Sequence, residues 1–182
     1  ALIVIMLIGD NFFLERFYEY RKEHVLQNAY LEIDRYLQEG GGFSSVFPEE
    51  ESGSGTDTAV TRYISNLTEK ENISVIITDN TSSRSYTSSA NPNALLQRLS
   101  SYILGKSGDK RKSLYEGENY TIVKTEGRGD EGGYMESWGY FSDNSTSFIM
   151  SMPLSSLSEA VSVFNSFLLF LGFITMVLGI II

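Results

Sequence analysis

The sequence predicts an α+β domain in which a long N-terminal helix packs on a central antiparallel sheet of about five strands, followed by a C-terminal helix. Residues 10–39 contain neither Gly nor Pro and carry apolar side chains at helical spacing. From residue 72 onward, short runs of β-branched and aromatic residues alternate with turns rich in Gly, Asp and Asn. The length of 182 residues fits one domain with appendages.

Two stripes of side chains are predicted on the first helix, over residues 10–39. Leu26, Tyr30, Ile33 and Leu37 recur at spacings of four, three and four, so they share one face. We expect this face to contact the sheet. A second, aromatic stripe consists of Phe13, Phe17, Tyr20 and His24.

The predicted elements after this helix alternate between loops, a second helix and a hairpin. Residues 40–55 are rich in Gly, Ser and Glu and indicate a loop. Thr56 is expected to cap a helix that ends near Lys70. Its predicted buried face consists of Val60, Ile64 and Leu67.

A strand at 72–80 follows, with Ile73, Val75 and Ile77 on its predicted buried face. A short partner strand is expected at 83–89.

A third helix and three more strands complete the predicted sheet. Asn91 and Pro92 indicate a helix start, and Leu95, Leu99 and Ile103 recur at helical spacing. Residues 106–113 are predicted to form a charged loop. Three consecutive strands at 119–126, 132–142 and 146–153 then suit an antiparallel meander, and Pro153 opens the last helix.

Both ends of the sequence are strongly apolar. Residues 167–182 contain no charged side chain, and residues 1–9 have the same character up to Asp10. A bilayer core of about 30 Å takes roughly 20 apolar residues in a helix. We therefore expect residues 1–9 to end a first transmembrane helix, 10–163 to form an extracytoplasmic domain, and 164–182 to start a second transmembrane helix. The alternatives for residues 1–9 are the core of a signal peptide and a buried helix.

Composition narrows the classes of function. The 14 Lys and Arg residues against 23 Asp and Glu give a formal charge of −9, which disfavours a nucleic-acid partner. The absence of cysteine excludes disulfides, thiolate metal sites and cysteine nucleophiles.

Catalysis finds little support in the sequence. The sole histidine, His24, offers neither a Ser/His/Asp triad nor a multi-histidine metal site. Two acidic pairs occur in turn-like segments without the spacing of an EF-hand, so we interpret them as surface charge. No catalytic residue, metal or cofactor is predicted. The acidic pairs are Glu116/Glu118 and Asp130/Glu131.

Three short motifs resemble functional signatures but are interpreted as non-functional. Residues 127–132, GRGDEG, fit G-x-G-x-x-G, but a strand pattern follows where a phosphate-binding helix would be needed, so a hairpin turn is expected. The embedded Arg128-Gly129-Asp130 tripeptide and five glycosylation sequons can arise by chance in a chain rich in Ser, Thr and Asn; the alternative is that they belong to a surface adhesion protein. The sequons begin at Asn66, Asn72, Asn80, Asn119 and Asn144.

The stretch YMESWGY, residues 134–140, predicts a ligand-binding face. Strand alternation places Tyr134, Glu136, Trp138 and Tyr140 on one face, and Met135 and Phe141 on the other. Aromatic rings supply contact area, and a carboxylate among them supplies orientation. The alternative is that these tyrosines are ordinary core and rim residues. We expect the polar partners of this face to be Arg84, Tyr86 and Tyr120.

Several stretches resemble the extracytoplasmic Cache or PDC sensor domain, a PAS-like module, of bacterial membrane sensor histidine kinases. They span most of the chain and include both apolar ends. In that family the sheet and its overlying loops build the ligand cavity. The stretches lie at residues 16–37, 72–79, 95–105, 119–126, 134–141 and 148–172.

The resemblance implies a sensor of a two-component system. Such a domain relays a small-molecule or protein stimulus through two membrane helices to a cytoplasmic kinase, which acts on a response regulator. It also implies a homodimer. Two alternatives stay open at this point: the sensor domain of a chemoreceptor or cyclase, and a membrane-anchored adhesion protein.

Overall fold

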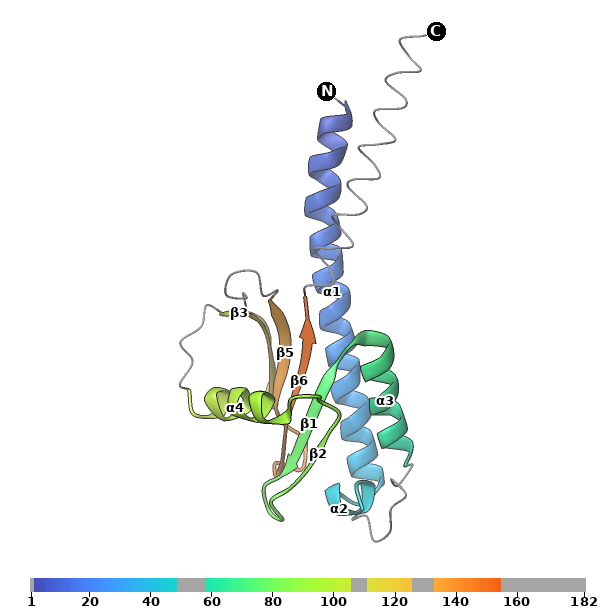
Figure 1. Cartoon of the computed structure of the whole chain (residues 1–182), viewed down its shortest axis with the longest axis vertical. Helices are drawn as coiled ribbons and strands as arrows, with labels where there is room; N and C mark the ends of the chain where they lie inside the picture. The colour runs from blue at the N-terminus through green and yellow to red at the C-terminus, as the bar shows by residue number, and fades with distance from the viewer. Residues whose placement is uncertain (1, 49–57, 106–110, 126–132, 155–182) are drawn as a thin grey trace.

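The computed structural model of the chain describes residues 2–48, 58–105, 111–125 and 133–154 (Figure 1). These residues form an α+β fold. Its helices are α1 (Leu2–Glu39), α2 (Phe43–Val46), α3 (Ala59–Glu71) and α4 (Pro92–Ile103), and its strands are β1 (Ser74–Asp79), β2 (Arg84–Thr87), β3 (Arg111–Glu116), β4 (Tyr120–Thr125), β5 (Tyr134–Tyr140) and β6 (Thr146–Pro153).

The strands form one antiparallel sheet in the order β2-β1-β6-β5-β4-β3. The hairpin of β1 and β2 and the meander that ends in β4, β5 and β6 are confirmed. The first and last strands, β1 and β6, pair with each other as the second and third strands of the sheet order. This arrangement brings the two ends of the sheet-forming region together.

The sheet has six strands where the sequence predicted about five. The additional strand, β3, begins at Arg111, inside the segment that we expected to be a charged loop. It lies at an edge, none of its residues is fully buried, and its register shifts between Ser113 and Tyr115. An exposed edge strand with a bulge does not show the alternation of apolar and polar residues on which a strand prediction depends.

Helices α1 and α3 cover one face of the sheet (Figure 1). The predicted α1 stripe is confirmed, because Leu26, Tyr30, Ile33 and Leu37 are all buried. Tyr30 stacks on Tyr120 of β4, with ring centroids 4.1 Å apart. The predicted α3 face is confirmed as well, and its N-cap is Thr58 in place of Thr56.

Helix α4 lies on the opposite face of the sheet (Figure 1). Asn91 caps it through a hydrogen bond to the Ala94 backbone amide, and Pro92 occupies its first turn, as expected. Of the three apolar residues at helical spacing, Leu95 and Leu99 are buried. The third, Ile103, ends the helix and is 43% exposed, whereas Tyr102, 6% exposed, is buried against the sheet. The aromatic ring fits there because its hydroxyl finds a buried acceptor.

One buried carboxylate joins α1 to the turn between β5 and β6. Asp34 accepts hydrogen bonds from the backbone amide of Ser142 at 2.9 Å and from its hydroxyl at 2.7 Å. Gln38 donates a third at 2.8 Å. A second link between α1 and the sheet is the ion pair of Lys124 with Glu19. These polar contacts fix the position of α1 along the sheet.

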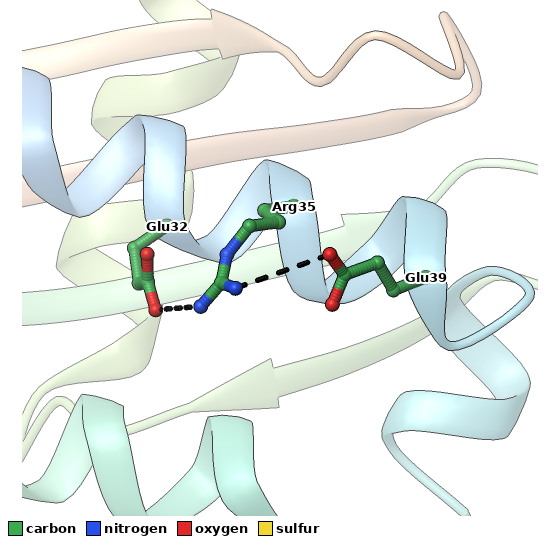
Figure 2. A network of polar contacts seen from close by, with 3 residues as sticks. All are labelled: Glu32, Arg35 and Glu39. Atoms are coloured by element: carbon green, nitrogen blue, oxygen red, sulfur yellow. Dashed lines mark hydrogen bonds and ion pairs between the residues drawn. The ribbon is translucent and has the colours of Figure 1, made fainter.

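Other charged residues of α1 form a surface network (Figure 2). Arg35 lies between Glu32 and Glu39 and pairs with both carboxylates. The hydrogen bond that Arg35 donates to Glu32 is the main cause that raises the pKa of Arg35. Exposed ion pairs of this kind contribute little to stability because water screens them. The network therefore favours helix formation in α1 without joining it to the sheet.

The described residues include only part of the predicted terminal segments. Residues 2–9 belong to α1, whose N-terminal part extends beyond the sheet (Figure 1). The predicted C-terminal helix and the predicted membrane segment at 164–182 lie outside the described residues. Within the described ranges, no helix has both the length and the apolar character needed to cross a bilayer.

We expect Asp34→Ala to lower the free energy of unfolding by about 1–3 kcal/mol, because the Ser142 amide and hydroxyl lose a charged hydrogen-bond acceptor. Urea denaturation monitored by circular dichroism measures the change. Glu39→Ala on the same helix is the matched control, since Glu39 is 65% exposed, and it should change stability very little. Equal effects of the two substitutions would contradict the role given to Asp34.

Candidate functional site

The candidate site centres on Glu136, a carboxylate of β5 that is only 1% exposed. Arg98 of α4 pairs with its Oε1 at 2.9 Å, and the Ser151 hydroxyl of β6 donates to the same oxygen at 2.9 Å. The Tyr102 hydroxyl of α4 donates to Oε2. Buried charges occur in proteins when they are paired and hydrogen-bonded, as this one is. The cluster therefore joins α4 to the middle of the sheet.

Helical spacing places the α4 members of this cluster. Leu95, Arg98, Leu99 and Tyr102 lie three or four positions apart, so they share the face that meets the sheet. Arg98 is 34% exposed because its side chain reaches the site from the edge of the helix. Two apolar residues thus bury the helix, while Arg98 and Tyr102 supply its polar contacts.

A layer of aromatic rings surrounds the ion pair. The ring of Tyr102 stacks on that of Trp138, with centroids 5.1 Å apart and an interplanar angle of 13°. The guanidinium carbon of Arg111 lies 3.8 Å from the centroid of the Tyr102 ring. That of Arg98 lies 4.8 Å from the Tyr134 ring. Both arginines therefore make cation–π contacts within the same layer.

The environment of Tyr102 keeps its hydroxyl protonated. Burial raises the pKa of Tyr102, and the neighbouring carboxylate of Glu136 raises it further. A protonated hydroxyl donates to Glu136 at neutral pH. The cluster consequently combines the guanidinium groups of Arg98 and Arg111 with the Glu136 carboxylate and the neutral phenol of Tyr102.

Four of the seven predicted ligand-binding residues lie on the α4 face of the sheet. Alternation along β5 puts Tyr134, Glu136, Trp138 and Tyr140 on this face, where Glu136 pairs in register with Ser151. Met135 and Phe141 lie in the core on the α1 side, as the pattern predicted. The structure therefore places the four residues taken from the single stretch 134–140 on one face of the sheet, and contacts within the cluster involve Tyr134, Glu136 and Trp138.

The other three lie on the opposite face. Tyr86 stacks on Phe47, with centroids 4.6 Å apart, and Arg84 donates a 2.8 Å hydrogen bond to the Phe47 carbonyl. Tyr120 stacks on Tyr30 of α1. Our expectation that Arg84, Tyr86 and Tyr120 are the polar partners of the face formed by Tyr134, Glu136, Trp138 and Tyr140 therefore needs correction, because strand register directs them to the α1 side of the sheet.

The residues that do contact Glu136 were missed in the sequence. Arg98 interrupts the apolar face of the predicted α4 helix, three residues after Leu95, and this charge on an apolar face is the one pattern that pointed to a buried partner. Arg111, which contacts the Tyr102 ring and not Glu136 itself, lies in the strand that was predicted as a loop. Ser151 carries no distinguishing pattern.

Among the described residues, the other polar groups do not assemble into a catalytic or metal centre. No group of three or more His, Cys, Asp or Glu residues is placed to hold a metal ion. His24 packs edge-on against Tyr20, 4.4 Å between centroids. Asp79 accepts hydrogen bonds from Ser82 and Thr81 in the β1–β2 turn, which lowers its pKa to about 2. The Asp79 carboxylate therefore stabilises the β1–β2 turn.

Of the remaining sequence motifs, one lies at exposed positions and the others lie outside the described residues. Glu116 and Glu118 are exposed near the β3–β4 turn. Asp130, Glu131 and the Arg-Gly-Asp tripeptide lie outside the described residues. The cluster around Glu136 contains groups that can bind a ligand through charge, hydrogen bonds and aromatic contact.

Comparison of the chain with protein-family models, curated proteins and solved structures gives no match.

We expect Glu136→Ala to lower the free energy of unfolding by about 3 kcal/mol, near the lower end for a broken buried ion pair, because Arg98 keeps partial access to water. Adding Arg98→Ala should cost less than the sum of the two single changes, with a coupling of about 0.5–3 kcal/mol. Urea denaturation of the four proteins measures this cycle. Glu118→Ala is the exposed control, and strictly additive effects would contradict the pairing.

Proposed function

We propose that the chain is the extracytoplasmic signal-sensing domain of a membrane-bound sensor histidine kinase. In this proposal the cluster around Glu136 receives the stimulus, and α1 carries the response toward the membrane. The fold is a PAS-like domain of the Cache type. The stimulus is a small molecule or a protein, and the final partner is a response regulator.

The observation that carries the proposal is that one strand, β5, contacts both the candidate site and α1. Glu136 lies within β5 beneath α4, whereas Phe141 and Ser142, directly after β5, contact α1 through Tyr30 and Asp34. A displacement of β5 caused by binding beneath α4 therefore alters contacts of α1. A coupling of about 1–3 kcal/mol between two such sites is typical of allosteric proteins.

The path out of the domain is a single helix. α1 is continuous from Leu2 to Glu39, and its N-terminal part extends beyond the sheet (Figure 1). A continuous helix transmits translation or rotation over its whole length. Apolar sequences at residues 1–9 and 167–182 support anchoring of both ends in a bilayer. The same layout suits a chemoreceptor or a cyclase, so the kinase output rests on the resemblance alone.

A second copy of the chain is the proposed partner of the outer face of α1. Tyr20 is 61% exposed and Leu31 59% exposed, both on the side of α1 away from the sheet. Burial of large apolar side chains favours association between helices. Parallel packing of two α1 helices would bring the predicted membrane segments of both copies to the same side.

To test the sensing function, the chain is joined at Ile182, in several helical registers, to the cytoplasmic part of a well-characterised histidine kinase. Autophosphorylation in membrane vesicles is the readout. Glu136→Gln should change the rate of autophosphorylation several-fold, because the substitution weakens the contacts of β5 with Arg98 and Tyr102 of α4. The exposed control Glu118→Gln should match the wild type. If no register yields an output that responds to Glu136→Gln, the proposed relay is wrong.

We expect Tyr20→Glu to weaken self-association of the complete chain in detergent, because it places a charge in the proposed α1 contact. Analytical ultracentrifugation measures the dimer dissociation constant. Ile103→Glu places the same charge at an exposed apolar position of α4, 43% exposed, and should leave association unchanged. An equal loss in both variants, or none in Tyr20→Glu, would argue against this interface.

A further inference from the structure

The outer face of α1 carries side chains at the spacing of a two-stranded coiled coil. Residues 17, 24 and 31 are seven positions apart, and residues 20 and 27 lie between them, so the five positions fit the a and d sites of a heptad. We call this line the α1 seam; its members are Phe17, Tyr20, His24, Gln27 and Leu31. Three of them are large and exposed, Phe17 at 54%, Tyr20 at 61% and Leu31 at 59%.

The α1 seam lies opposite the side of the helix that packs on the rest of the domain. At about 3.6 residues per turn, residues two positions apart point to nearly opposite sides of a helix. His24 is exposed, whereas Leu26, two positions later, is fully buried. Lys22, two positions earlier, pairs with Glu71 of α3. The seam therefore faces outward, where a second α1 can pack against it.

Symmetry places His24 opposite itself in such a dimer. In a parallel pair of identical helices related by a two-fold axis, each a position faces the same position of the second copy. The neighbouring layers of the seam are occupied by Tyr20 and Leu31, which supply apolar contact area. His24 is the only member of the seam that can gain a charge near neutral pH.

The groups on α1 around His24 do not offset an added positive charge. Its ring contacts Tyr20 edge-on, with centroids 4.4 Å apart, which holds the imidazole on the outer face. Arg21, less than one turn earlier, is exposed and contributes a positive charge to the same side. Glu23, the nearest carboxylate in the chain, accepts a hydrogen bond from Gln27 at 3.3 Å.

The charged groups on the elements packed against this part of α1 have partners of their own. Glu71 of α3 pairs with Lys22, and Lys124 of β4 pairs with Glu19. None of the ion pairs among the described residues includes His24. A proton gained by His24 in the dimer is therefore opposed by the second His24 and by Arg21 of both copies.

We propose that His24 makes the self-association of α1 sensitive to pH, so that the dimer weakens in acid. This inference rests on the proposed function and adds a regulation of its α1 contact. Two imidazolium groups that face each other repel, so the dimer binds protons less readily than the separated chains do. By linkage, association is strongest where His24 is neutral and is lost progressively as the pH falls through the range in which histidine gains its proton.

Analytical ultracentrifugation of the complete chain in detergent, at about pH 7.5 and about pH 5.5, tests the inference. We expect the dimer dissociation constant of the wild type to rise about tenfold or more at the lower pH, which corresponds to about 1.4 kcal/mol. His24→Gln keeps a polar side chain without a titratable group, so it should associate about equally at both pH values. Because the chain has a single histidine, no other imidazole contributes to the difference.

A permanent charge at the same position gives an independent check. His24→Lys should associate weakly at both pH values, because it carries its charge throughout this range. Asn66→Lys places the same charge at an exposed position of α3, away from the seam. It should show the association and the pH dependence of the wild type.

Four outcomes overturn the inference: equal association of the wild type at both pH values, tighter association in acid, an unchanged pH dependence in His24→Gln, or tight association of His24→Lys at the higher pH. A dimer that is weakened by Tyr20→Glu but ignores pH refutes the role of His24 alone and leaves the α1 contact in place. Absence of any dimer refutes that contact as well, and the kinase fusion then tests the sensing function separately.

Discussion

The fold depends on burial of both faces of its central strands. Every residue of β6 from Thr146 to Met152 is buried, because α1 and α3 cover one face of the sheet and α4 covers the other. Polar side chains on such strands need partners inside the protein. Ser151 meets this need by donating to Glu136, and Thr146 by donating to Asp143. The polar contacts of the sheet are consequently specific and few.

This two-sided burial divides the domain into faces with different chemistry. The α1 side is a large apolar and aromatic core that is fixed at its border by Asp34 and by the pair of Lys124 with Glu19. The α4 side has a smaller apolar core with an ion pair at its centre. Removing one partner of a buried pair is strongly destabilising, whereas a ligand that supplies new partners can shift it. In the proposed relay, the α4 side receives the stimulus and the α1 side transmits it.

Local periodicity was sufficient to predict most elements. The stripe from Leu26 to Leu37, the capped helix after Asn91 and the alternation in 134–140 all depend on residues close in sequence. The site was predicted only as far as β5. Its partners Arg98 and Tyr102 come from an element more than thirty positions earlier, and the sheet register that excludes Tyr120 depends on long-range pairing. Neither is encoded in local spacing.

The central claim is that β5 couples the cluster beneath α4 to α1. Amide hydrogen exchange of the complete chain, compared between wild type and Glu136→Gln, tests it most directly. Faster exchange is predicted in α4 and β5 and also in α1 around Asp34, whereas Glu116→Gln on the edge strand should leave α1 unchanged. Faster exchange confined to α4 and β5, with α1 exchanging as in the wild type, would contradict the coupling.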